Sequence, residues 1–194
     1  KHWSQLDTTY LLRHDAREIA RPARLPNYRV DTRTPAVTAR LSPVGEGVQV
    51  LIYTPDQKSL FAQICAFFER ISFSIVEAKV YTTLHGYALD TFQVMDPSRS
   101  GGHYRDILAY IEHELAAQLQ RGGPLPPPVK GRISRRVRSF PMTPEVNLRP
   151  DERGNAYYLF FTAGDRPGLL SSVARVLVEY GINVQTAKIN TLGE

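Results

Sequence analysis

The sequence contains one segment twice. Asp56–Phe61 (DQKSLF) returns as Asp165–Leu170 (DRPGLL), a shift of 109 (165 less 56), and the following apolar positions keep this shift without a gap. Thus Leu60, Ile64, Phe67, Phe68 and Ile71 correspond to Leu169, Val173, Val176, Leu177 and Tyr180. Solenoid repeats recur every 20–50 residues, so this longer period predicts two copies of one small domain. A duplicated small module favours a regulatory role over a catalytic one.

The composition narrows the class of protein. The hydrophobic share of 42% and the charged share of 22% are ordinary for a globular protein. No apolar run approaches the roughly 18 residues that cross a bilayer. The single cysteine, Cys65, excludes a disulfide framework within the chain and fits the cytoplasm. The chain starts at Lys1 without Met or a signal core, so we expect a piece of a longer protein.

The net charge of +5 is concentrated in two stretches, Lys130–Arg138 and Arg13–Arg40. An anionic partner surface or plain solvation would each account for them. Aromatic residues are not interleaved with the basic ones as in single-strand binders, which weighs against nucleic acid as a partner.

The first copy predicts a complete ferredoxin-like unit. Its predicted elements are strands at 37–41 and 48–54, a helix at 58–72, a hairpin of strands at 73–83 and 87–95, a helix at 103–121 and a strand at 132–140. From 48 onward the order is βαββαβ, which predicts an antiparallel sheet with both helices on one face.

The second copy predicts a strand at 156–162, a helix at 167–180 and a strand at 182–192, where the sequence stops. We therefore expect an α+β chain with tandem ferredoxin-like domains, the second truncated after its second strand. The expected parts are a helical tail of an upstream domain at 1–25, a first domain with an N-terminal strand extension at 26–140, a linker at 141–150 and half of a second domain at 151–194. The open sheet edge predicts cover by the first copy or by a second chain in a homodimer.

Two phrases of the second copy carry a family resemblance. Asp165–Leu170, and Gly181–Val184 one helix later, resemble the ACT domain, a βαββαβ module that binds amino acids and regulates metabolic enzymes. The turn before the helix offers free backbone N–H groups to a carboxylate. The ligand-binding residues expected from this resemblance are Asp165, Arg166, Gly168, Leu169 and Asn183, with Asp56, Gln57, Leu60 and Ser74 in the first copy.

Longer phrases resemble the C-terminal tandem ACT region of the bifunctional uridylyltransferase/uridylyl-removing enzymes of bacterial nitrogen control. They are Leu12–Asp15, Tyr53–Gln57, Tyr87–Phe92, Arg149–Gly154 and Thr186–Glu194. The resemblance implies a glutamine-sensing region, the PII signalling protein as the substrate of the whole enzyme, and magnesium in its catalytic domains. The alternatives are a stand-alone amino-acid-binding regulator and a dimerisation module without a ligand.

We expect no catalytic and no metal-binding residues in this chain. The pair His14–Asp15 lacks further ligands and is better explained as a helix surface. Asp56 and Asp165 have an alternative role as charges favourable to a helix N-terminus, and Gly168 has one in backbone geometry alone.

Overall fold

The structure is a computed structural model that describes residues 33–43, 45–96, 104–128, 142–152, 154, 156–164, 166, 168–184 and 187–190. The predicted tail at 1–25, which includes His14–Asp15, the predicted strand at 132–140 and the basic segment Lys130–Arg138 all lie outside these residues. The first copy contains β1 (Ala36–Leu41), β2 (Val48–Pro55), α3 (Leu60–Arg70), β3 (Ser74–Lys79), β4 (Tyr87–Met95) and α4 (Arg105–Arg121). The second contains β5 (Glu145–Pro150), β6 (Tyr157–Thr162), α6 (Leu169–Glu179) and β7 (Lys188–Asn190).

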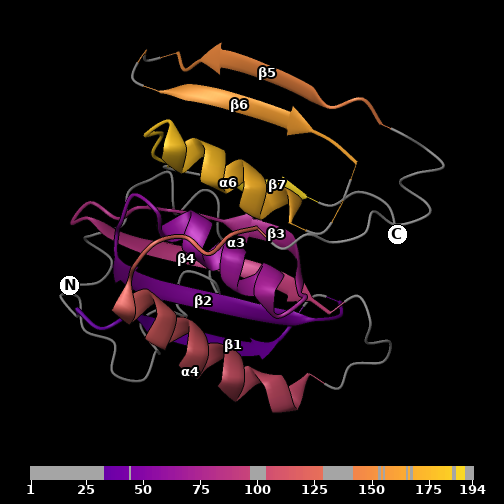
Figure 1. Cartoon of the computed structure of the whole chain (residues 1–194). Coiled ribbons are helices and arrows are strands. Elements are labelled where there is room, and N and C mark those ends of the chain that lie inside the picture. The colour runs from indigo at the N-terminus through magenta and orange to yellow at the C-terminus, as the bar shows by residue number, and fades with distance from the viewer. Residues whose placement is uncertain are drawn as a thin grey trace.

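The first copy is an antiparallel sheet with two helices packed on one face (Figure 1). Its strands lie in the order β1-β2-β4-β3, followed by β7 of the second copy. Val48, Val50 and Ile52 alternate along β2 and form one core with the apolar stripes of both helices. Because α3 and α4 share this core, the predicted α+β, ferredoxin-like arrangement with helices on one face is confirmed.

β2 has two neighbours in the sheet, and one of them, β1, comes before β2 in the chain. β1 pairs with β2 along its whole length, from Ala36 opposite Tyr53 to Leu41 opposite Val48. The Glu112 carboxylate on α4 accepts a hydrogen bond from the Ala39 N–H at 2.7 Å. In a βαββαβ unit the last strand lies at this edge of the sheet, beside the first strand. Here β1 lies there instead, so the described elements of the first copy follow the order ββαββα.

The second copy also begins one strand earlier than predicted. Residues 145–150 form β5, which pairs antiparallel with β6, so the prediction that 141–150 is only a linker is wrong for this part. β5 stands 109 residues after β1, and α6 stands 109 residues after α3. The structural repeat therefore includes the leading strand.

The two copies meet around a local twofold axis. Lys188 is the counterpart of Lys79, and β3 and β7 pair so that these two lysines face each other. The helices α3 and α6 lie side by side, with the equivalent residues Cys65 and Ala174 buried in one cluster (Figure 1). Small side chains at these positions let the two helix backbones approach closely.

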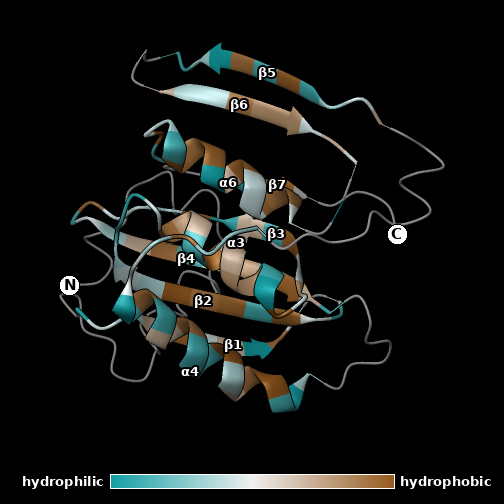
Figure 2. Cartoon of the chain, viewed as in Figure 1, coloured by the Kyte–Doolittle hydropathy of each residue, from teal (hydrophilic) through white to brown (hydrophobic). Residues whose placement is uncertain are grey.

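The edge of β7 is covered by the first copy, as predicted, and Ile189 packs against the first copy's core. β7 is shorter than the predicted strand at 182–192, and it does not pair with β6, which belongs to a separate two-stranded sheet. Figure 2 shows apolar residues along both β2 and β6, although only β2 is buried. No helix in the described part of the chain is long and apolar enough to cross a membrane.

Candidate functional site

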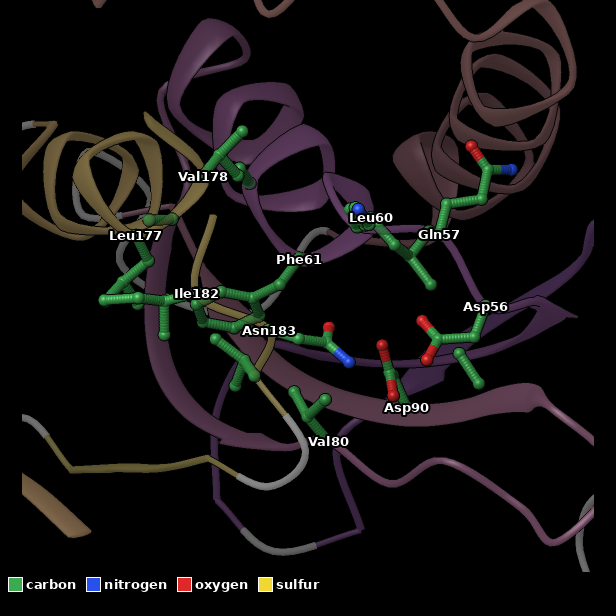
Figure 3. A pocket seen from close by; sticks show the side chains of 15 residues that line it. Asp56, Gln57, Leu60, Phe61, Val80, Asp90, Leu177, Val178, Ile182 and Asn183 are labelled. Atoms are coloured by element: carbon green, nitrogen blue, oxygen red, sulfur yellow. The ribbon is translucent and has the colours of Figure 1, made fainter. Parts of the chain in front are cut away.

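A cleft lies between the two copies, at the start of α3 (Figure 3). The space between the atoms of its walls is about 370 Å³, and this volume includes open solvent. The first copy lines it with Asp56, Gln57, Lys58, Leu60, Phe61, Ala62, Val80, Ala88 and Asp90. The second copy lines it with Ala174, Leu177, Val178, Ile182, Asn183 and Val184.

The turn between β2 and α3 forms one wall. The Asp56 N–H donates to the Gly86 carbonyl at 3.0 Å, and the Asp56 carboxylate accepts from the Thr82 hydroxyl at 3.0 Å. α3 begins after Ser59, whose side chain makes no capping hydrogen bond to the described residues of the helix. The first N–H groups of a helix lack intrahelical partners and carry partial positive charge, so this end of α3 favours an anion such as a carboxylate.

Asp90 is a buried carboxyl in the floor of the cleft. It lies on the same face of β4 as Ala88 and Phe92, and it is 1% exposed. Its Oδ1 accepts a hydrogen bond from the Tyr81 N–H at 3.2 Å, whereas its Oδ2 is buried without a hydrogen-bond partner among the described residues. Burial raises the pKa of Asp90 to about 8. The hydrogen bond from the Tyr81 N–H lowers this pKa, and the nearby Asp56 carboxylate makes a smaller contribution that raises it.

Asn183 brings a polar group from the second copy. The chain turns after α6 at Gly181, which has a φ of 67°, and the Ile182 N–H donates to the Leu177 carbonyl at 2.8 Å. Figure 3 shows the Asn183 carboxamide reaching toward Asp90 across the cleft. A carboxamide offers both donors and an acceptor, so it can bind either polar end of an amino acid.

The structure brings four of the predicted site residues together and separates the others from them. Asp56, Gln57, Leu60 and Asn183 line the cleft, whereas Arg166, Gly168, Leu169 and Ser74 do not. Asp165 lies outside the described residues. Arg166 and Ser74 are exposed, and Gly168 precedes α6 with a φ of 76°, a backbone conformation that glycine adopts without strain.

The structure places Asn183 beside a different turn from the one that we expected. We expected Asn183 to join the turn at Asp165–Leu169 of its own copy, and it lies instead with the turn of the first copy. The local twofold axis explains why Asn183 lies beside the turn of the other copy, because this symmetry places the Ile182–Val184 segment next to the start of α3. Three predicted residues outside the cleft are counterparts of residues inside it: Ser74 of Asn183, Arg166 of Gln57 and Leu169 of Leu60. The counterpart of Gly168 is Ser59, which does not line the cleft.

Sequence reasoning missed Asp90, Lys58, Phe61 and Val80 as cleft residues. For Asp90 the signal was present, because it stands at an inward position of the predicted strand at 87–95, two residues from Phe92. Among the described residues, no group of three His, Cys, Asp or Glu side chains is placed to hold a metal ion.

The comparisons with known proteins agree with this architecture. Residues 157–194 match the family model of the ACT domain. No solved structure matches the chain.

The whole chain is similar to one region of much longer proteins. It is 56% identical over 194 residues to the bifunctional uridylyltransferase/uridylyl-removing enzyme of Cupriavidus pinatubonensis, covering 99% of this chain and 22% of that protein. It is 57% identical over 196 residues to the enzyme of the same name from Ralstonia nicotianae, covering 99% of the chain and 23% of the protein. The corresponding values for the Chromobacterium violaceum enzyme are 55% over 191 residues, 98% and 22%. The chain thus spans between a fifth and a quarter of the length of these relatives.

Proposed function

We propose that this chain is a regulatory region that binds an amino acid, with glutamine as the ligand, in the cleft between its two copies. The observation that supports the proposal most directly is the pairing of opposite chemistries in one cleft. The uncapped start of α3 favours a carboxylate, and the carboxylates of Asp56 and Asp90 favour an N–H donor. A free amino acid carries both groups on one carbon.

The position of the cleft supports regulation. Its walls come from two copies held together by the short β3–β7 ladder and by the contact of α3 with α6. A ligand that contacts both walls binds the docked arrangement more tightly than a separated one, and so shifts the balance between them. This coupling gives the ligand a way to act on domains attached to either copy.

The similar proteins suggest the setting. We propose that the chain regulates an enzyme of the cytoplasm that uridylylates and deuridylylates the PII signalling protein, and that the protein works as a homodimer. Magnesium would serve catalytic domains of that enzyme, and we assign it no residue here. In this proposal the chain senses the ligand and carries out no chemistry of its own.

The test is calorimetric titration of the full-length protein with L-glutamine, using Asn183→Ala as the variant. Loss of the Asn183 carboxamide removes a donor and an acceptor, and we expect the dissociation constant to rise by a factor of about 10 to 100. Ser74→Ala is the matched control, because Ser74 occupies the equivalent position and lies outside the cleft.

Absence of glutamine binding by the wild type would contradict the proposal and favour a dimerisation module without a ligand. Equal effects of the two substitutions would argue against this cleft as the site.

A further inference from the structure

We propose that Asp90 is the residue that selects an ammonium group in the cleft, together with Asp56 and Asn183. This inference rests on the proposed function and adds to it a specificity-determining residue and the ligand group that it recognises. The starting observation is the Oδ2 of Asp90, which has no hydrogen-bond partner among the described residues.

The unpartnered oxygen is costly in the free protein. Asp90 is 1% exposed, and its Oδ2 has no hydrogen-bond partner among the described residues, while Oδ1 is already engaged by the Tyr81 N–H. A buried acceptor without a donor destabilises the folded state. An apolar residue would pack against Ala88 and Phe92 without this cost, so the position is unfavourable for stability alone.

The neighbouring groups favour a cationic donor. Figure 3 shows the Asp56 and Asp90 carboxylates and the Asn183 carboxamide directed into the same opening. An ammonium group has three N–H donors and no acceptor, and these three side chains can offer one acceptor each. A positive charge between two carboxylates also removes the repulsion that Asp56 exerts on Asp90.

Other charged groups near Asp90 do not provide this cation. Cys65 on α3 is neutral, because burial raises the pKa of its thiol, and Glu69 beside Cys65 is acidic. Tyr81 after β3 contributes its backbone N–H. Lys58 lines the cleft, but its side chain is exposed, and no hydrogen bond joins it to Asp90 among the described residues.

The proposal predicts that ligand binding releases a proton. With a pKa of about 8, Asp90 is protonated in the free protein at neutral pH. An ammonium group favours the ionised carboxylate, so binding at about pH 7 should release about one proton, and affinity should rise about tenfold per pH unit from about pH 6 to 7.

The experiment compares L-glutamine with 4-carbamoylbutanoate, the same molecule without its ammonium group, in the full-length wild type and in Asp90→Asn. We expect the wild type to bind glutamine about 10 to 100 times more tightly than the analogue, and Asp90→Asn to lose most of this preference. Calorimetry in buffers of different ionisation enthalpy measures the released proton, which should disappear in Asp90→Asn. Asp106→Asn, an exposed carboxyl on α4, is the matched control and should behave as the wild type.

Equal glutamine affinity in the wild type and Asp90→Asn would overturn the inference, and so would binding without proton release. The second result would mean that Lys58 or the Asp90 proton already satisfies the site. Both results leave glutamine binding intact, so they contradict this inference and not the proposed function. A wild type that binds no glutamine would overturn both.

Discussion

β2 and β6 are the same strand of the repeat in opposite environments. Val48, Val50 and Ile52 of β2 are all 0% exposed, whereas their counterparts Tyr157, Leu159 and Phe161 in β6 are 69%, 45% and 39% exposed. The β6 side chains are at least as large and carry extensive apolar surface. Burial in this molecule is therefore decided by which elements surround a strand, and not by the strand's own sequence.

The surroundings differ in a specific way. β2 lies between β1 and β4 and is covered by α3 and α4. Within the described residues β6 has one partner strand, β5, and no counterpart of α4. An apolar strand surface contributes to stability in proportion to the area removed from water, so the first copy holds most of the folding energy.

The largest expected effect is the difference between Ile52→Ala and Phe161→Ala. Truncation of the fully buried Ile52 should lower the free energy of unfolding by about 2–5 kcal/mol. Phe161 is larger but partly exposed, and its truncation should cost less than about 2 kcal/mol. Urea denaturation of each variant measures both values, and a larger loss for Phe161→Ala would show that β6 is covered in solution.

The second largest expected effect is the pH dependence of stability that comes from the buried carboxyl of Asp90 in the first copy. The pKa of Asp90 is about 8 in the folded chain against an ordinary value of 3.8. The unfolded chain therefore loses the proton first, and stability falls as pH rises from about 4 to about 8. Asp90→Asn lacks this loss, so at about pH 7 it should be more stable than the wild type by on the order of a few kcal/mol.

Thermal unfolding between about pH 3 and 9 tests this prediction. The two curves should converge at the acid end and separate as pH rises. Parallel curves would mean that Asp90 is ionised or paired in the free protein.

The sequence predicted the elements that depend on local pattern. The helical spacing of Leu60, Ile64, Phe67 and Phe68 predicted α3, and the 109-residue shift then predicted α6. β5 was missed because its segment carries prolines, which indicate a linker, although Val146 and Leu148 alternate as in a strand. Pro150 is compatible with β5 because it stands at the end of an edge strand.

The candidate site was only half predictable, because it depends on docking. Asp56, Gln57 and Asn183 have polar side chains suited to binding. The turns before α3 and α6 are close equivalents, however, so the local sequence does not indicate which of them Asn183 approaches. The register of the β3–β7 pair determines which turn lies beside Asn183, and this register depends on contacts between residues about a hundred positions apart.

The third effect tests the contact between the copies. Ala174 is 1% exposed and packs against Ala62 and Cys65, so Ala174→Leu should overfill the α3–α6 contact and cost about 1–3 kcal/mol. Burial raises the pKa of the Cys65 thiol, which keeps it protonated and unreactive. Cys65 is the single cysteine, so faster alkylation in the variant would report the helices moving apart. Val176→Leu, at a half-exposed position of the same helix, is the control, and an unchanged alkylation rate in Ala174→Leu would contradict this packing of α3 against α6.

The smallest expected effect is the repulsion between Lys79 and Lys188, which lie opposite each other at the local twofold axis. Lys79 and Lys188 face each other across the β3–β7 ladder, and like charges directly opposite destabilise a strand pair. Lys188→Glu should therefore stabilise the docked copies by about 0.2–1 kcal/mol, and less at high salt because added ions screen the charges. The double variant Lys79→Glu/Lys188→Glu restores two like charges and should return to about the wild-type stability. Urea denaturation at low and high salt separates the outcomes, and a double variant more stable than Lys188→Glu would show that the two side chains do not interact across the axis.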